Sequence, residues 1–277
     1  MKPERPFLTA RWTELLVLNF AVPSEVVARL APPGTEPDLF DGQAYLSVLG
    51  FMFRDARFFG VGLPWQRQFE EVNLRYYVRR ETELGTRRGV VFVREIAPQP
   101  LVAATARWLF NESYVTRRMR NSVRFAGPRL GAGDEIGYEW RTGERGRRTW
   151  NRMSARIAAT PLLPAPGTLA EFIIEHYWAY THQRDGGTSE YRVAHRPWRV
   201  APVENLEWNC DLAMTYGDSP LAEYLAAPPV LSFVADGSPV QVFRGLRLEE
   251  STPTAKRAQP LATRDLIAAV SAESDCE

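Results

Sequence analysis

Lysine is almost missing from this chain of 277 residues. It occurs only at positions 2 and 256, and the rest of the 34 basic residues are arginines. Arginine stays protonated and is not an amine nucleophile, so it cannot form the Schiff base that lysine forms with a carbonyl substrate. Because Lys2 is terminal and Lys256 lies in a polar tail, the sequence argues against amine-based covalent catalysis.

Cysteine and histidine are also scarce, with two cysteines and three histidines in the whole chain. Cys210 and Cys276 imply no disulfide framework, which favours a reducing compartment and a cytoplasmic protein. His176 and His182 are six residues apart, which is not the i, i+4 spacing of two metal ligands on one helix face. We therefore predict no metal site and no cofactor.

Long hydrophobic runs and common nucleotide-binding motifs are absent. The longest apolar stretches, such as residues 15–18 and 89–93, fall far short of the roughly 18 residues that a membrane helix needs. The N-terminus has no apolar core typical of a secretory signal. With a net charge of +1, nothing attracts the chain generally to nucleic acid or to an anionic membrane. The expected partner is a small molecule, and an oligomer is compatible with the sequence.

What the chain does contain is a series of strand patterns with single helices between them. Strands are predicted at 14–22, 43–55, 69–81, 88–96 and 188–195, two more at 118–127 and 133–143, one at 148–159, and helices at 24–30, 100–110 and 169–183. Strands outnumber helices, which indicates an α+β protein built on a large, mostly antiparallel sheet or barrel. Residues 1–248 are predicted to form one domain, and 249–277 a disordered tail.

Several local signals refine this prediction. Ser24 is placed to cap the first helix, and Thr168 with Glu171 forms a capping box for the helix at 169–183. Gly50 is a candidate β-bulge. Residues 202–227 suggest short helices and loops. Asp236-Gly237 predicts the turn of a hairpin over 229–248.

The stretch FEEVNLRYYV (69–78) carries the most informative polar pattern. Alternation puts Glu71, Asn73, Arg75 and Tyr77 on one face of the strand. Arginine can hold a carboxylate through two hydrogen bonds, asparagine can orient a carbonyl group, and glutamate can act as a base. The other interpretation is a solvated face with a cross-strand ion pair, since alternation does not say which face is dry.

Two other places contain candidate functional residues. Asn111, Glu112 and Tyr114 follow the end of a predicted helix and could form a loop that closes a pocket, although asparagine also simply terminates helices. His195 at a strand end could exchange protons near neutral pH, although a structural role is more common for such a histidine. His176 is interpreted as a core residue.

One strand face presents a different surface. Trp150, Arg152 and Arg156 lie on the same side of the strand at 148–159, where they could contact a partner. An exposed face with extended arginine side chains is the preferred interpretation. Cys210 is expected to be an inert thiol, because no basic residue nearby in the sequence would lower its pKa.

Seven segments together resemble the YqjF-like family of uncharacterised bacterial proteins. They are FLTARW (7–12), LNFAVP (18–23), GFMFR (50–54), FEEVNLRYYV (69–78), RGVVFVREI (88–96), RWLFNESY (107–114) and AHRPW (194–198). The resemblance extends from about residue 7 to residue 200, and FEEVNLRYYV together with RGVVFVREI is its most specific part. The family brings no established activity.

That family is similar in fold to acetoacetate decarboxylase, which implies a closed β-barrel with an internal pocket and a few flanking helices. In a barrel, alternate residues of each strand point inward, so the row Glu71, Asn73, Arg75 and Tyr77 would line the pocket. The catalytic lysine of the decarboxylase has no counterpart, because residues 111–114 read NESY. Its first-strand arginine has none either. The resemblance therefore implies the fold without Schiff-base decarboxylation.

The leading interpretation is a barrel that binds a small organic anion or carbonyl compound. Arg75 would anchor the ligand, Asn73, Tyr77, Asn111 and Tyr114 would contact it, and Glu71, Glu112 and His195 would carry any proton transfer. A non-catalytic ligand-binding or sensing protein is the first alternative. An interaction module with a packed barrel is the second. The sequence leaves open whether the protein is an enzyme.

Overall fold

The computed structural model describes residues 4–62, 67–100, 111, 113–125, 130–143 and 148–248. The strands are β1 (Leu8–Val22), β2 (Glu36–Pro37), β3 (Ala44–Phe58), β4 (Phe69–Thr82), β5 (Gly85–Ala97), β6 (Tyr114–Thr116), β7 (Met119–Asn121), β8 (Glu135–Thr142), β9 (Thr149–Ile157), β10 (Trp178–His182), β11 (Thr188–His195), β12 (Val200–Asn209), β13 (Leu231–Val242) and β14 (Leu246–Arg247). The helices are short: α1 (Ser24–Leu30), α3 (Leu169–Ile174), α4 (Leu212–Tyr216) and the 3₁₀ helix η2 (Ala222–Ala226). The protein is therefore mostly sheet with few helices, as the sequence predicts.

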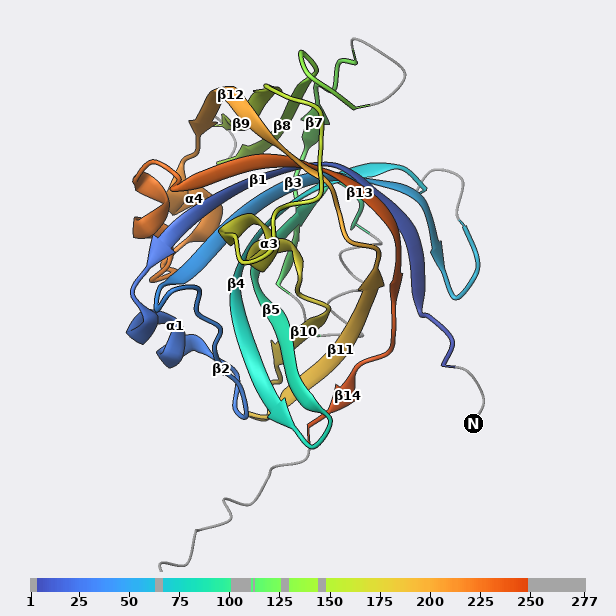
Figure 1. The fold of residues 1–277 in the computed structure, drawn as a ribbon, viewed down its shortest axis with the longest axis vertical. Coiled ribbons are helices and arrows are strands. Elements are labelled where there is room, and N and C mark those ends of the chain that lie inside the picture. The colour runs from blue at the N-terminus through green and yellow to red at the C-terminus, as the bar shows by residue number, and fades with distance from the viewer. Residues whose placement is uncertain are drawn as a thin grey trace, which may run out of the picture.

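Backbone pairing links seven of these strands in a ring. Antiparallel pairs join β13 to β1, β1 to β3, β3 to β4 and β4 to β5. Strand β10 then pairs in parallel with β5 and antiparallel with β11. The path returns through β11 to β13, where Val193 lies opposite Val242. Figure 1 shows β4, β5, β10, β11 and β13 following one another around the lower half of the molecule.

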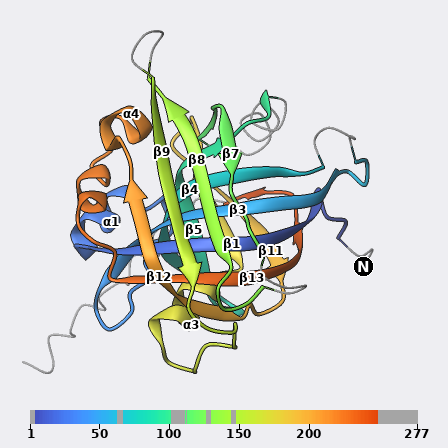
Figure 2. The same ribbon diagram turned by 90° about the horizontal axis from the view of Figure 1, so that it is seen from above.

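The remaining long strands form a second layer over the ring. Strand β12 pairs first with β13 and then, from Val203 onward, with β9, which continues to β8 and β7. In Figure 2, β8, β9 and β12 run steeply across β1 and β3. This arrangement covers the outer face of β1, β3 and β4, so these strands are buried on both sides.

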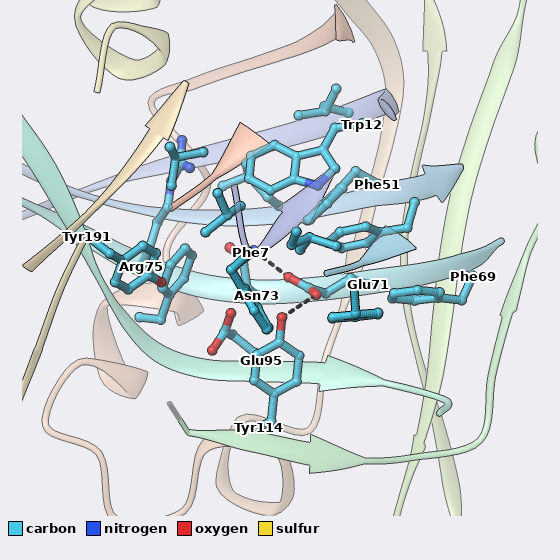
Figure 3. Close-up of a pocket in the computed structure, with 18 of the residues that line it drawn as sticks. Phe7, Trp12, Phe51, Phe69, Glu71, Asn73, Arg75, Glu95, Tyr114 and Tyr191 are labelled. Carbon is cyan, nitrogen blue, oxygen red and sulfur yellow. Dashed lines mark hydrogen bonds between the residues drawn. The ribbon is translucent and has the colours of Figure 1, made fainter. Parts of the chain in front are cut away.

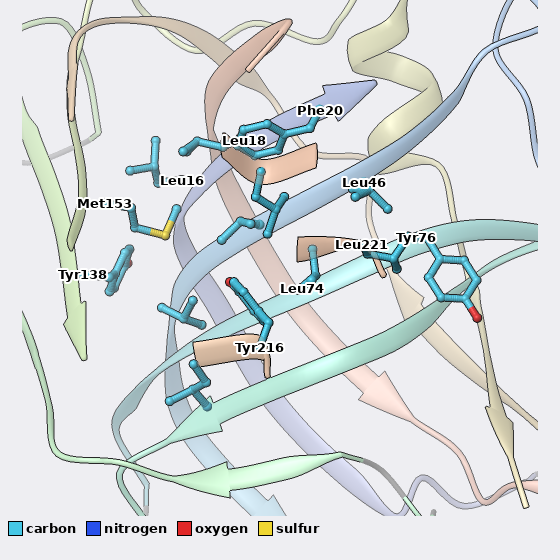
Figure 4. Close-up of a cluster of buried hydrophobic side chains, with 14 of the residues drawn as sticks. Leu16, Leu18, Phe20, Leu46, Leu74, Tyr76, Tyr138, Met153, Tyr216 and Leu221 are labelled. Atoms are coloured by element: carbon cyan, nitrogen blue, oxygen red, sulfur yellow. The ribbon is translucent and has the colours of Figure 1, made fainter. Parts of the chain in front are cut away.

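Strand β4 separates two hydrophobic clusters. Its outward side chains Val72, Leu74 and Tyr76 join the cluster between the ring and the second layer, shown in Figure 4. Its inward side chains Phe69 and Tyr77 join a cluster inside the ring. The polar row of β4 thus faces the interior, and the solvated-face interpretation is wrong.

Gly50 allows the second layer to approach β3. A Cβ atom at this position would lie 2.4 Å from Cδ2 of Tyr138. Tyr138 is fully buried and its hydroxyl donates to the carbonyl oxygen of Glu14 at 2.7 Å. The register shift lies between Thr13 and Leu16 on β1, where Glu14 has a φ of 52°. The bulge therefore belongs to β1, and the prediction of a bulge at Gly50 itself is wrong.

The predicted helix at 169–183 is only partly correct. Thr168 caps it, because its side chain accepts a hydrogen bond from the backbone of Glu171. The Glu171 carboxylate accepts from the backbone of Gly167 at 2.7 Å and does not complete the box at Thr168. The helix ends at Ile174, and Trp178–His182 form strand β10 instead. Aromatic and β-branched residues favour strands, and pairing with β5 and β11 outweighs the helical pattern.

The predicted hairpin at 229–248 is one continuous strand, β13. Gly237 has a φ of 77°, and a Cβ there would lie 2.0 Å from the carbonyl oxygen of Trp12. Residues 233–235 pair with β12 and residues 240–242 pair with β11. Asp236-Gly237 therefore marks a change of neighbour, where glycine tolerates a backbone that other residues avoid. The prediction for 202–227 also missed the strand β12.

Helix α1 is present at its predicted bounds, but Pro23 occupies the N-cap and Ser24 makes no capping hydrogen bond. The predicted helix at 100–110 falls almost entirely outside the described residues, as do Glu112 and the tail at 249–277. Within the described part of the chain, no helix has the length and apolar character to cross a membrane.

We expect Gly50→Ala to destabilise the protein by about 1–3 kcal/mol, the usual penalty for overpacking a core. The buried ring of Tyr138 cannot move away without breaking its bond to Glu14. Urea unfolding gives the free energy of unfolding. Gly62→Ala is the matched control, because its Cβ would make only ordinary contacts, the nearest at 3.4 Å. Equal stability of the two variants would contradict the assigned role of Gly50.

Candidate functional site

A cavity of about 80 Å³ lies inside the ring of strands. Its lining comes from β1, β3, β4, β5, β6, β11 and β13, with Phe7 and Trp198 from adjoining segments. Aromatic side chains dominate the wall, including Phe7, Trp12, Phe51, Phe53, Phe69 and Trp198. Against this apolar wall stand a few polar groups, most of them on β4 and β5, and Figure 3 shows them converging.

Strand β4 contributes three of these polar groups through its pleat. Glu71, Asn73 and Arg75 are 2%, 3% and 8% exposed and all line the cavity. Glu95 on β5 lies opposite Asn73 and is equally buried. Charged groups are rarely buried to this degree unless they are paired or functional. Each of them therefore needs a specific explanation.

Glu71 is held by two hydrogen bonds. The hydroxyl of Tyr114 donates to Oε2 at 2.7 Å and the amide Nδ2 of Asn73 donates to Oε1 at 3.1 Å. Burial raises the pKa of Glu71 to about 7, against the opposite effect of the two hydrogen bonds. A carboxyl group with a pKa near neutrality can both accept and return a proton at physiological pH.

Arg75 has no acidic partner among the described residues. Its Nε donates to the Tyr77 hydroxyl at 3.3 Å and an Nη donates to the carbonyl oxygen of Ile173 at 3.4 Å. The guanidinium carbon also lies 5.4 Å from the centroid of the Tyr77 ring. Arg88, by contrast, is partly buried and pairs with Asp38 at 2.7 Å. The cavity thus contains a buried cation whose charge the described side chains do not neutralise.

A chain of hydrogen bonds from Tyr77 through Ser47 to Asn19 supports Arg75. Ser47 donates to the Oδ1 of Asn19 at 2.6 Å, and Asn19 donates to the backbone of Leu231 at 3.0 Å. With the Ser47 proton so used, the Tyr77 hydroxyl donates to Ser47 at 2.5 Å. The Tyr77 oxygen is then free to accept from Arg75. Every link in this chain runs in one direction, which favours the charged guanidinium.

The structure separates the candidates that the sequence proposed. Glu71, Asn73, Arg75 and Tyr114 line the cavity together. Tyr77 is 1% exposed and supports Arg75 without lining the cavity. The roles of these residues toward a ligand stay predictions.

The other candidates lie elsewhere. The Asn111 side chain donates to the backbone of His182 at 2.7 Å and is not among the residues that line the cavity. His195 stacks on Trp198 with ring centroids 4.2 Å apart and donates from Nδ1 to the carbonyl of Arg196. Burial lowers the pKa of His195 to about 4. Trp198 lines the cavity, whereas His195 is not among the lining residues.

Sequence reasoning missed Glu95. Simple alternation along β5 puts Phe92 and Glu95 on opposite faces, yet both line the cavity. The pairing of Arg75 with Phe92 and of Leu74 with Arg94 leaves Val93 as an extra residue. This bulge reverses the alternation and turns Glu95 inward. A glutamate at the end of a strongly apolar strand was the only available signal.

Other singled-out residues have structural partners. His176 is buried, bonds to Asp38 at 3.0 Å and packs on Tyr77 and Phe172, as expected for a core residue. Arg152 pairs with both Glu139 and Glu207, which favours a solvated strand face over a docking surface. Burial raises the pKa of Cys210 to about 12. Among the described residues, no group of three or more histidine, cysteine or acidic side chains is arranged to hold a metal ion.

The raised pKa of Glu71 makes stability depend on pH. The folded state binds a proton at about pH 7, whereas an unperturbed glutamate does so at 4.5. The folded state is therefore stabilised by the proton that it binds at Glu71. This contribution to the free energy of unfolding is complete below pH 4.5 and is lost as the pH rises through 7. Relative to Glu71→Gln, the wild type should lose on the order of 3 kcal/mol of unfolding free energy between pH 4.5 and pH 8.

Urea unfolding across this pH range measures that difference. Glu70→Gln controls for loss of a negative charge from β4, since Glu70 lies on the opposite face and bonds to exposed Asn121. Parallel curves for wild type and Glu71→Gln would show that Glu71 ionises as it does in water.

Comparison with known proteins places the fold and the family. Residues 9–238 match the family DUF2071, described as an uncharacterized conserved protein. Uncharacterized protein YqjF of Bacillus subtilis (strain 168) is 30% identical over 200 residues, which cover 70% of this chain and 74% of that protein. The predicted resemblance to YqjF is thereby confirmed.

Two solved structures show the same fold. An acetoacetate decarboxylase-like enzyme from Sphingomonas wittichii RW1 aligns with a TM-score of 0.60 at 13% identity, covering 87% of this chain and 93% of that one. The enduracididine biosynthesis enzyme MppR, complexed with the condensation product of pyruvate and imidazole 4-carboxaldehyde, aligns with a TM-score of 0.59 at 14% identity, covering 89% and 91%. At such low identity these likenesses show the fold alone. By its sequence match, the chain belongs to the DUF2071 family.

Proposed function

We propose that this protein binds a short-chain organic carboxylate inside the ring of strands and transfers a proton to and from it through Glu71. The observation that carries the proposal is the buried Arg75 guanidinium, which lines the cavity without an acidic partner among the described residues. An uncompensated buried charge is strongly unfavourable. A bound carboxylate would neutralise the guanidinium charge and accept hydrogen bonds from two of its free N–H groups.

The proposal treats the ring as a closed barrel. The return pairing of β11 with β13 supports this, as does the alternation of β4 between an outer apolar face and an inner polar face. A closed barrel of this size encloses a small ligand and excludes bulk water. In such a dry space the attraction between Arg75 and a carboxylate is stronger than at the surface.

The cavity volume limits the ligand. One water molecule needs about 10–15 Å³ of such space, so a cavity of about 80 Å³ has room for a small organic molecule but not for a large one. This supports a short-chain acid. It also disfavours the interaction-module alternative, in which the interior is filled by side chains.

Glu71 is the group best placed for proton transfer. Burial holds its pKa near 7, and Tyr114 and Asn73 fix its carboxyl group at the cavity wall. As carboxylate it would take a proton from the bound ligand, and as carboxylic acid it would return that proton to the same or a neighbouring atom. Among the described residues the cavity lining includes no lysine, and the proposed proton transfer uses no Schiff base.

The structural neighbours agree with a ligand of this class. One is named as an acetoacetate decarboxylase-like enzyme, and MppR holds a condensation product of pyruvate. Both names concern small carbonyl compounds. A non-catalytic binding or sensing protein is the second candidate, because both Glu71 oxygens already accept hydrogen bonds, as in a purely structural carboxylate.

Removing the buried charge should separate binding from stability. In Arg75→Met the unpartnered guanidinium is replaced by an apolar chain of similar length, so the ligand-free protein should be at least as stable as wild type. Ligand binding should be lost. A bound acid at one hundred times its Kd stabilises the wild type by about 2.7 kcal/mol, a rise in Tm of roughly 5–10 °C.

A thermal-shift screen of short-chain carboxylates, esters and ketones tests this, with Arg79→Ala as the control. Arg79 lies on the same strand but pairs with Glu36 at the surface. Binding that survives in Arg75→Met, or a screen with no carboxylate among its hits, would contradict the proposed anchor.

Proton transfer can be tested without knowing the overall reaction. In D₂O, a wild-type protein that removes a C–H proton from a bound acid exchanges it for deuterium, and proton NMR of the ligand shows the signal disappear. Glu71→Gln should bind the acid but slow the exchange at least a hundredfold, within the usual range for a general base. Binding with no exchange in the wild type would favour the sensing protein.

A further inference from the structure

One polar atom at the cavity has no partner. The side-chain oxygen Oδ1 of Asn73 is fully buried and makes no hydrogen bond with any described residue. A buried acceptor without a donor is unfavourable by roughly 1–3 kcal/mol. Such orphan groups are uncommon in native proteins and call for an explanation. Because Asn73 lines the cavity, a bound ligand is the natural source of the missing donor.

The orientation of the Asn73 amide follows from Glu71. The Nδ2 group donates to Oε1 of Glu71, while Tyr114 donates to Oε2 of the same carboxyl group. Since the nitrogen faces Glu71, the oxygen is turned away from it. Figure 3 shows the bond from the amide to the Glu71 carboxyl group as a dashed line. The site therefore presents an acceptor, and its partner must be an N–H or an O–H.

A second orphan lies across the cavity. The indole Nε1 of Trp12, on β1, is a buried donor that also lacks a partner among the described residues. The cavity thus offers a cation at Arg75, a donor at Trp12 and an acceptor at Asn73. A carboxylate can accept hydrogen bonds from donors such as Arg75 and Trp12, because its oxygens are acceptors only. Only a ligand that also carries a donor can serve Asn73.

We propose that the ligand is a short-chain 2-hydroxy acid, bound in preference to the matching 2-keto acid. This inference rests on the proposed function and specifies its substrate class. Asn73 and Arg75 are next neighbours on one face of β4, about 7 Å apart along the strand. In a cavity of about 80 Å³, a donor that reaches Asn73 lies close to the carboxylate held by Arg75.

The alternatives leave groups unsatisfied. The carbonyl oxygen of a 2-keto acid would meet the Asn73 oxygen, so that two acceptors face each other. The ammonium group of a 2-amino acid brings a second positive charge beside Arg75. A hydroxyl supplies one donor and no charge. Sites built to bond a hydroxyl discriminate strongly against analogues that lack it.

Binding measurements on matched acids test the proposal. Calorimetry would compare lactate with pyruvate, 2-hydroxybutyrate with 2-oxobutyrate, and both series with propionate and alanine. We expect the hydroxy acids to bind the wild type at least tenfold more tightly than the keto acids, about 1.4 kcal/mol. In Asn73→Leu, which removes the acceptor, the preference should shrink to within about twofold.

The outcomes distinguish this inference from the function on which it rests. Equal or tighter binding of the keto acids, with all binding lost in Arg75→Met, would overturn the hydroxy-acid preference and leave the carboxylate site intact. Tighter binding of alanine would overturn it in the same way. Absence of binding by every acid would overturn both. If Asn73→Leu does not fold, lactate against propionate in the wild type decides, and equal affinity refutes a role for the hydroxyl.

Discussion

Burial of β4 on both faces is the constraint on which the rest of the structure depends. Its outer face packs under the second layer through Val72, Leu74 and Tyr76, and its inner face points into the ring. A strand in this position normally carries apolar residues on both sides. This one instead carries a glutamate, an asparagine and an arginine inward, which is unfavourable for folding alone. The surrounding structure compensates by supplying Tyr114, Tyr77 and a backbone carbonyl as partners.

The surrounding structure compensates Glu71 more fully than Arg75, and this difference indicates what the site binds. Glu71 is fully bonded and its raised pKa lets it become neutral. Arg75 has no such option, because a guanidinium stays charged at any physiological pH. The cavity lining therefore combines one permanent positive charge, Arg75, with an acid that can become neutral, Glu71, and a second acid, Glu95. Such a site favours an anion at Arg75 and tolerates the negative charge of that anion near Glu71.

Much of this arrangement could be predicted from the sequence because it rests on alternation. The row of β4 and the apolar character of β5 follow directly from a period of two residues. Features set by tertiary pairing could not be predicted this way. Residues 178–182 continue a helical pattern yet form β10, because the edge of β5 offers a pairing partner that no local signal reveals. Asp236-Gly237 has the signature of a turn, but β13 continues through it and changes its pairing partner from β12 to β11. Glycine is needed there because the backbone of Trp12 lies too close for a side chain.

The same limit explains why only part of the site was found. Glu71, Asn73, Arg75 and Tyr114 were predicted from strand spacing and a segment shared with the resembled family. Glu95 was hidden by the bulge at Val93, and Trp12 by an apparently ordinary aromatic position on β1. Bulges move a side chain from one face to the other by inserting one residue. Two polar residues of the cavity lining are thus contributed by strands other than β4. A site in the interior of a ring is complete only when several strands are in register, so its chemistry is a property of the pairing as much as of any one segment.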